Sequence, residues 1–158
     1  METQHNETQL IYRFFTNHPL MTLATISESG DAHSAAVYVY LTPDLTCYFV
    51  TKTATDKFKN IKKNAKATLS TYDENFLMFG ELVGEAQQLE SEEEVNTIIL
   101  ELQKVFESRK SSYWAPPVTQ ITGGEYVIIK VSPRQINYTN FEQSSSDNPH
   151  PHEINLTL

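Results

Sequence analysis

The sequence has a single cysteine and no long hydrophobic run, and these shortages exclude two classes of protein. Because Cys47 is alone, a disulfide within the chain is excluded, and we expect a reducing compartment. No apolar segment approaches the roughly 20 residues that a membrane-spanning helix needs. The polar start Met-Glu-Thr-Gln-His-Asn-Glu is unlike a signal peptide. We therefore expect a cytoplasmic protein without a membrane partner.

Glycine is also scarce, and the motifs of several enzyme classes are missing. With five glycines in 158 residues, the chain has no Walker or Rossmann signature, so a phosphate would have to be bound by a helix start and by side chains. The G-x-S-x-G elbow of hydrolases and the H-E-x-x-H pair of zinc proteases are absent. The tail histidines His150 and His152 have no cysteine or carboxylate at ligand spacing, and we predict no metal site.

What the sequence does contain is typical of a β-rich globular protein. Hydrophobic residues make up 39% of the chain, with eight Tyr and eight Phe, and the length suits one domain with a sizeable core. The formal net charge of -8 would repel nucleic acid, so we expect no nucleic-acid partner.

Runs of alternating and β-branched residues predict a mainly β fold of about six to seven antiparallel strands with flanking helices. We predict a meander of strands over 21–27, 32–41 and 46–51, then strands over 65–72, 76–89, 125–131 and 135–139. Gly80 and Gly84 in the fifth strand indicate a barrel corner, which we favour, a bulge, or the close approach of a flat ligand. Residues 1–140 would form one domain and the polar run 141–158 a mobile tail.

Two segments show the spacing of helices with one apolar face. The first ends at Asn17-His-Pro19. The second begins with the capping box Ser91-Glu-Glu-Glu94, and its apolar stripe would serve as core or as a dimer seam. The loop that follows contains Tyr113 and Trp114 beside two prolines, and it would either cover a ligand or anchor the packing.

The segment Thr51–Asn64 concentrates positive charge and hydroxyl groups where a strand gives way to a short helix. Six of the twelve Lys and Arg residues lie within or just after it. Thr55 is a natural N-cap, so the first backbone N–H groups of the helix would point outward. Together with the Lys57 ammonium and the hydroxyls of Thr51, Thr53 and Thr55, they would form a phosphate cradle.

The alternative is an ordinary helix with a solvated lysine face, and local spacing does not separate the two interpretations. The ligand of a phosphate cradle here would have a phosphate at one end and a flat or apolar body that lies on a tyrosine-rich wall. FMN meets that description.

Several runs of the chain together resemble a known family. These runs are Leu23-Ala-Thr-Ile26 with Gly30 and His33, Val37-Tyr-Val-Tyr40, Tyr48-Phe-Val-Thr51, Thr55-Asp-Lys57, Asn60-Ile-Lys-Lys-Asn64 and Gly80–Ala86. They are similar to the FMN-binding split β-barrels related to pyridoxamine 5′-phosphate oxidase. The resemblance covers roughly Leu20–Leu89, with weaker support from Glu125–Asn140.

The resemblance implies a split β-barrel, a homodimer and two FMN sites at its interface. Thr51, Thr55 and Lys57 match positions that hold the flavin phosphate, with Lys52 beside them, and Val50 matches a stretch that lines the ring. The strand from Ser34 to Tyr40, with Tyr38, would pass beneath the isoalloxazine. From the other subunit, Phe79, Trp114 or Tyr113 would contact the flavin.

Three features depart from the family pattern. Ser34-Ala-Ala36 stands where many flavin binders have an arginine, and Asp56 stands at a position that is often arginine. A like charge about 6 Å from a phosphate costs on the order of 2 to 3 kcal/mol at an effective dielectric constant of 20. The C-terminal Arg and His pair that binds pyridoxal-type phosphates has no counterpart, so we do not expect oxidation of vitamin B6 phosphates.

Three functions are therefore compatible with the sequence. The leading hypothesis is an FMN-dependent oxidoreductase that acts on an unidentified small molecule, in which the cofactor does the chemistry and no catalytic acid or base need appear. The second is a module on the same barrel that binds flavin, haem or another planar ligand without turnover. The third is a structural dimer whose site has decayed.

Overall fold

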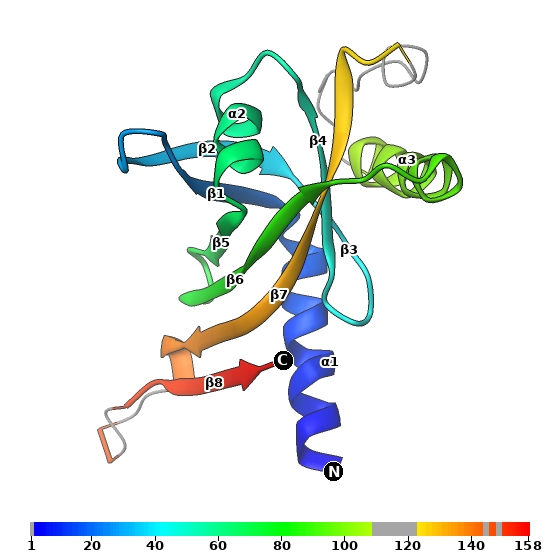
Figure 1. Ribbon diagram of the computed structural model, residues 1–158. Coiled ribbons are helices and arrows are strands. Elements are labelled where there is room, and N and C mark those ends of the chain that lie inside the picture. Colours follow the sequence, from blue (N-terminus) through cyan, green and yellow to red (C-terminus); the bar gives the residue numbers. More distant parts are fainter. Residues whose placement is uncertain (1, 109–122, 144–145, 148–149) are drawn as a thin grey trace.

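The computed structural model describes residues 2–108, 123–143, 146–147 and 150–158, and they form a curled antiparallel sheet with flanking helices (Figure 1). The chain runs through α1 (Glu2–Asn17), β1 (Leu20–Ile26), β2 (Ala32–Tyr38), β3 (Tyr40–Leu41), β4 (Cys47–Lys52), α2 (Asp56–Lys63), β5 (Lys66–Asp73), β6 (Met78–Gln88), α3 (Glu92–Glu107), β7 (Tyr126–Asn140), the 3₁₀ turn η1 (Phe141–Gln143) and β8 (His152–Thr157). The predicted mainly β fold is confirmed.

The strands lie in the order β2-β1-β5-β6-β7-β4-β3, and β8 also pairs with β7. Inward and outward side chains alternate along β1 and β5, as expected for strands with one face on a core. The inward residues fill the half-barrel. Fully buried members include Leu23, Phe49, Leu69, Leu82 and Ile136.

The meander predicted for the first three strands is wrong in its second strand. Residues Ala32–Tyr38 pair with β1, whereas Tyr40 and Leu41 pair with β4. The strand breaks at Val39, whose N–H donates to the Pro19 carbonyl at 2.8 Å. This break lets one run of the sequence serve both edges of the curled sheet.

The two predicted strands over 125–131 and 135–139 are one strand, β7. It continues through Ser132-Pro-Arg134 because the register with β6 shifts between Val83 and Gly84, which leaves one extra residue on β7. A Cβ at Gly84 would lie 2.2 Å from the Ser132 carbonyl oxygen. Gly84 is therefore required by a bulge with a close backbone approach, one of the interpretations left open above.

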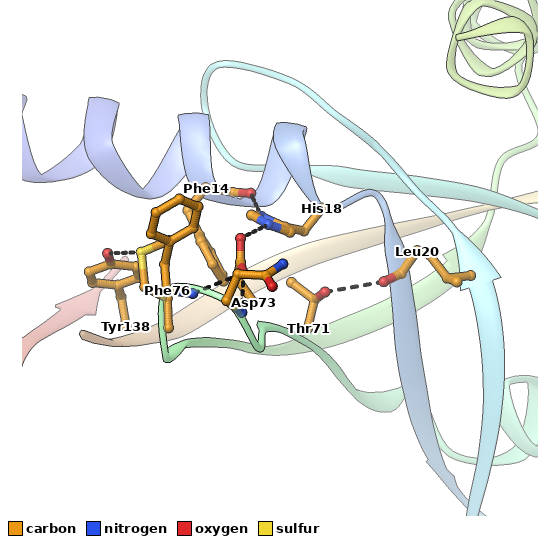
Figure 2. A network of polar contacts seen from close by, with 9 residues as sticks. Phe14, His18, Leu20, Thr71, Asp73, Phe76 and Tyr138 are labelled. Atoms are coloured by element: carbon orange, nitrogen blue, oxygen red, sulfur yellow. Dashed lines mark hydrogen bonds and ion pairs between the residues drawn. The ribbon is translucent and has the colours of Figure 1, made fainter. Parts of the chain in front are cut away.

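Helix α1 packs against the sheet at Gly80 and is tied to it by a polar network at its C-terminal end. A Cβ at Gly80 would lie 2.6 Å from the Phe14 ring. Figure 2 shows the His18 ring between two oxygen atoms, with Nδ1 2.8 Å from the Phe14 carbonyl and Nε2 2.8 Å from Asp73 Oδ2. Thr71 Oγ1 donates to the Leu20 carbonyl beside it at 3.1 Å.

The C-terminal segment departs from the predicted mobile tail over residues 152–157. These residues form β8, which pairs with the second half of β7. The physical reason is the apolar alternation of Ile154 and Leu156, both of which are buried in the main core.

Helix α3 forms a second, smaller core with the opposite end of the sheet. Ser91 accepts a hydrogen bond from the Glu94 N–H at 3.4 Å, so the predicted cap is present. Buried Ile98, Ile99 and Leu102 pack in one cluster with Tyr48 and Ile128. Much of the predicted apolar stripe is thus core. No helix in the described residues is long and apolar enough to cross a membrane.

Candidate functional site

A cavity of about 200 Å³ lies where β4 ends, α2 begins and the last turn of α3 approaches β2. In the view of Figure 1, α2 and α3 lie on either side of β4. The lining residues are Ala36, Val37, Tyr38, Val50, Thr51, Lys52, Thr55, Lys57, Phe106 and Tyr126.

The turn between β4 and α2 is held by its own hydroxyl groups. Thr51 is buried, and its Oγ1 lies 3.0 Å from Thr55 Oγ1. The Thr55 hydroxyl donates to the Lys52 carbonyl at 2.8 Å. Thr55 stands at the N-cap position, as predicted, but its side chain makes no capping hydrogen bond. The first N–H groups of α2 are therefore not satisfied by this side chain, and such groups bind anions.

Two lysines face the cavity, and their surroundings differ. Lys57 is half-buried and forms no ion pair with any described residue. Lys52 lies 3.4 Å from the Glu125 carboxylate and 5.2 Å from the centre of the Tyr126 ring. The hydrogen bond to Tyr126, together with Glu125, raises the pKa of Lys52, so this side chain stays cationic.

The other charged residues of the lysine-rich segment do not line the cavity. Asp56 is exposed and pairs with Lys59 at 3.5 Å. Lys63 pairs with Glu28. None of these side chains lines the cavity. The like charge that the sequence places in the middle of the cradle is thus exposed to solvent and stays out of the cavity lining.

The lining of this cavity is unusual for an acidic chain, because its polar side chains are hydroxyls and ammonium groups and none is a carboxylate. Three other cavities along the described residues each include at least one carboxylate. The largest, of about 550 Å³, is lined by Glu90 and Glu94 as well as Lys62 and Lys130. We select the smaller cavity because its donor set suits one kind of ligand, an anion.

The structure brings together six of the nine predicted cofactor-binding residues. They are Val50, Thr51, Lys52, Thr55, Lys57 and Tyr38. Ser34 is exposed on β2, two residues from Ala36, and does not line the cavity. Phe79 lies on β6, away from it. Trp114 and Tyr113 lie outside the described residues.

Sequence reasoning missed two aromatic residues of the lining. Phe106 packs edge-on against Tyr38 with ring centres 5.8 Å apart, and Tyr126 comes from the start of β7. Phe106 is the last residue of the apolar stripe of α3, where it is half-buried, packs against the smaller core and also lines the cavity. Its spacing predicted only the core contact, and its place at the end of the stripe was the one available signal.

The cavity lining contains neither Cys47 nor any His, Asp or Glu, the residue types that bind metals. Cys47 is fully buried, and burial raises the pKa of its thiol, so the thiolate needed for reaction does not form. No group of three or more His, Cys, Asp or Glu side chains in the described part of the chain is placed to hold a metal ion.

Comparisons with known proteins agree with this fold. A protein from Clostridium acetobutylicum related to general stress protein 26 of B. subtilis, of the pyridoxinephosphate oxidase family, is 16% identical with a TM-score of 0.69; the match covers 100% of this chain and 96% of that one. An FMN-binding protein related to pyridoxamine 5′-phosphate oxidase, from Nostoc punctiforme, is 12% identical with a TM-score of 0.59, over 97% and 94% of the two chains.

PhzG from Burkholderia lata, solved with tetrahydrophenazine-1-carboxylic acid, is 13% identical with a TM-score of 0.63, over 95% of this chain and 91% of that one. At these identities the likeness concerns the fold, which is the expected split β-barrel. No curated protein matches the sequence. The family model described as pyridoxamine 5′-phosphate oxidase matches residues 8–140. The chain therefore belongs to the pyridoxamine 5′-phosphate oxidase family.

Proposed function

We propose that the protein is a flavoprotein that binds the phosphate of FMN in the cavity between β4 and α2. The observation that carries this proposal is the convergence of Thr51, Thr55 and Lys57 with no carboxylate in the lining. To donate to a phosphate, the two hydroxyls would turn away from each other and from the Lys52 carbonyl. The family includes FMN-binding members, as the protein from Nostoc punctiforme illustrates.

The size of the cavity limits which part of FMN it would hold. At about 200 Å³ it is smaller than the 300 to 1,000 Å³ typical of sites for drug-sized ligands. It suits the phosphate and part of the ribityl chain, and the ring would extend beyond it. Ala36 in the cavity lining and Ser34, two residues away, are both exposed on the edge strand β2. Their small side chains leave room for a flat group.

The proposed activity is that of an FMN-dependent oxidoreductase acting on an unidentified small molecule. When bound, FMN supplies hydride or single-electron transfer. This chain would bind and orient it through Lys57 and the two threonines, and we assign no catalytic acid or base. Oxidation of vitamin B6 phosphates is not proposed, because the C-terminal Arg and His pair has no counterpart in the sequence.

We also propose that a second copy of the chain covers the outer face of β2-β1-β5-β6. Large apolar side chains are exposed along this face. Leu20 on β1 is 51% exposed and pairs with Tyr38 on β2. Tyr72 on β5 is 71% exposed and pairs with Phe79 on β6. Apolar surfaces of this kind mark interaction sites. In such a homodimer, Phe79 would be free to contact the flavin of the other subunit.

A second candidate is a module that binds FMN without turnover. The cavity lining contains no histidine and no carboxylate, the usual general acids and bases. This observation favours binding over catalysis by the protein's own groups. The remaining alternatives are a haem in place of flavin and a structural dimer whose site has decayed.

The visible spectrum of the purified protein separates these functions. We expect a flavin band, present on purification or after addition of FMN, that bleaches with a nicotinamide reductant and returns in air. A stable flavin band that does not bleach supports the binding module, and a Soret band indicates haem. A protein that takes up no FMN would contradict the proposal.

A further inference from the structure

Helix α2 carries a buried polar residue, although most of its charged residues are exposed. Asn60 is only 8% exposed, and its Nδ2 donates to Thr25 Oγ1 on β1 at 3.1 Å. Thr25 itself is 1% exposed. Beside Asn60 the only other buried residue of the helix is Ile61. A buried amide needs a partner, so this hydrogen bond is one of few arrangements that satisfy both groups.

An apolar residue would serve this position better if packing were its only role. Asparagine is a poor helix former compared with leucine, and leaving a buried amide unpaired is costly. A directional hydrogen bond differs from an apolar contact because it fixes the rotation of the helix as well as its distance from the sheet. Asn60 fixes α2 against β1 in this way.

The same helix carries the cavity residues at its N-terminal end. Thr55 precedes α2, and Lys57 lies three residues before Asn60, just under one helical turn away. At the N-terminal end, the pair between Thr51 and Thr55 ties the turn to β4. A helix of 8 residues held at its start and near its middle has little freedom to rotate. The position of Lys57 therefore depends on the bond between Asn60 and Thr25.

We propose that Asn60 is a positioning residue for the phosphate site, and that it acts through Thr25 by holding α2 in the rotation that directs Lys57 and Thr55 into the cavity. This inference rests on the proposed function, because it assigns a role toward the phosphate of FMN. Asn60 itself does not line the cavity.

The test uses two variants of the partner, Thr25→Val and Thr25→Ser, in the full-length protein. Valine keeps the shape but removes the oxygen that Asn60 donates to, whereas serine keeps that oxygen. The dissociation constants of FMN and of riboflavin, which lacks the phosphate, are measured for each. We expect Thr25→Val to weaken FMN binding about five- to tenfold, with riboflavin binding unchanged and with Thr25→Ser close to wild type. An equal loss for both flavins, or no loss for FMN, overturns the proposal.

A second measurement needs no ligand and separates this proposal from the proposed function. Hydrogen exchange in the ligand-free protein is compared between α2 and α3. We expect faster exchange in α2 of Thr25→Val and unchanged exchange in α3, with Thr25→Ser again close to wild type. Equal acceleration in both helices, or none in α2, overturns the positioning role. If wild type binds no FMN but Thr25→Val speeds hydrogen exchange in α2 and not in α3, the proposed function fails. The anchoring of α2 by Asn60 and Thr25 then still stands.

Discussion

At the scale of single residues, Asp73 joins three parts of the chain at the end of α1. One carboxylate oxygen lies 2.8 Å from the His18 ring, and the other accepts hydrogen bonds from the N–H groups of Asn75 and Phe76 at 2.9 and 3.2 Å (Figure 2). Desolvation raises the pKa of Asp73, but the hydrogen bonds from His18, Phe76 and Asn75 outweigh it and hold the pKa below its ordinary value.

The lowered pKa of Asp73 predicts how stability responds to acid. The ionised carboxylate stabilises the folded state fully above its unfolded pKa near 3.8, and this contribution is lost as the pH falls through the lower folded pKa. We expect Asp73→Asn to be less stable than wild type at neutral pH, and the difference to shrink below about pH 4. Urea unfolding at stepped pH measures it. A difference that does not change with pH would contradict this role.

The sequence predicted the residues of the cradle better than their surroundings. Thr51, Thr55 and Lys57 converge because a strand end and a helix start are close along the chain, which local spacing reveals. The absence of Asp56 from the lining depends on the rotation of α2, which we propose the contact between Asn60 and Thr25 fixes across 35 residues of sequence. Phe106 reaches the cavity only through the docking of α3. Such long-range contacts leave no local pattern.

At the scale of elements, two glycines of β6 are required by close approach, and each for a different reason. Gly84 faces the backbone of β7 at the bulge, with Ser132 O 2.2 Å from where a Cβ would lie. Gly80 faces the aromatic rings of α1, and a Cβ at this position would lie 2.6 Å from the Phe14 ring. A backbone carbonyl in a paired strand yields less readily than the rim of a side chain.

We therefore predict that Gly84→Ala destabilises the fold more than Gly80→Ala does. Overpacking of this kind costs about 1 to 3 kcal/mol, and we expect Gly80→Ala near the lower end and Gly84→Ala at or above the upper end. Denaturant unfolding gives both free energies of unfolding. The reverse order would show that β7 moves at the bulge more easily than α1 does.

The sequence did not predict two features that depend on hydrogen bonding to a neighbouring strand, namely β8 and the continuity of β7. The apolar alternation near the C-terminus has only two members, Ile154 and Leu156, and follows a polar run, so it did not predict a strand. Pairing with β7 nevertheless makes this segment a strand. Pro133 suggested an interruption of β7, but the bulge opposite Gly84 accommodates it. Both outcomes depend on the neighbouring strand.

At the scale of the whole molecule, a single chain leaves the apolar side chains of Leu20, Tyr72 and Phe79 exposed on the outer face of the half-barrel. For a chain of 18.0 kDa, we predict a solution mass of two chains by light scattering. Tyr72→Glu would place a charge on this face and give a single-chain mass. Leu100→Glu is the matched control, because Leu100 is 59% exposed on α3, outside this face. A monomeric wild type, or dissociation by the control alone, would contradict the proposed homodimer.

The proposed function requires that the cavity between β4 and α2 recognises a phosphate through Lys57. The most direct test is the ratio of FMN to riboflavin affinity in wild type, Lys57→Ala and Lys63→Ala, because Lys63 lies on the same helix but pairs with Glu28 outside the cavity. We predict that Lys57→Ala weakens FMN binding about 10- to 100-fold and leaves riboflavin binding unchanged, with Lys63→Ala close to wild type. Equal effects of the two substitutions on FMN binding would mean that the lysines act only as a diffuse field and that Lys57 does not contact the phosphate.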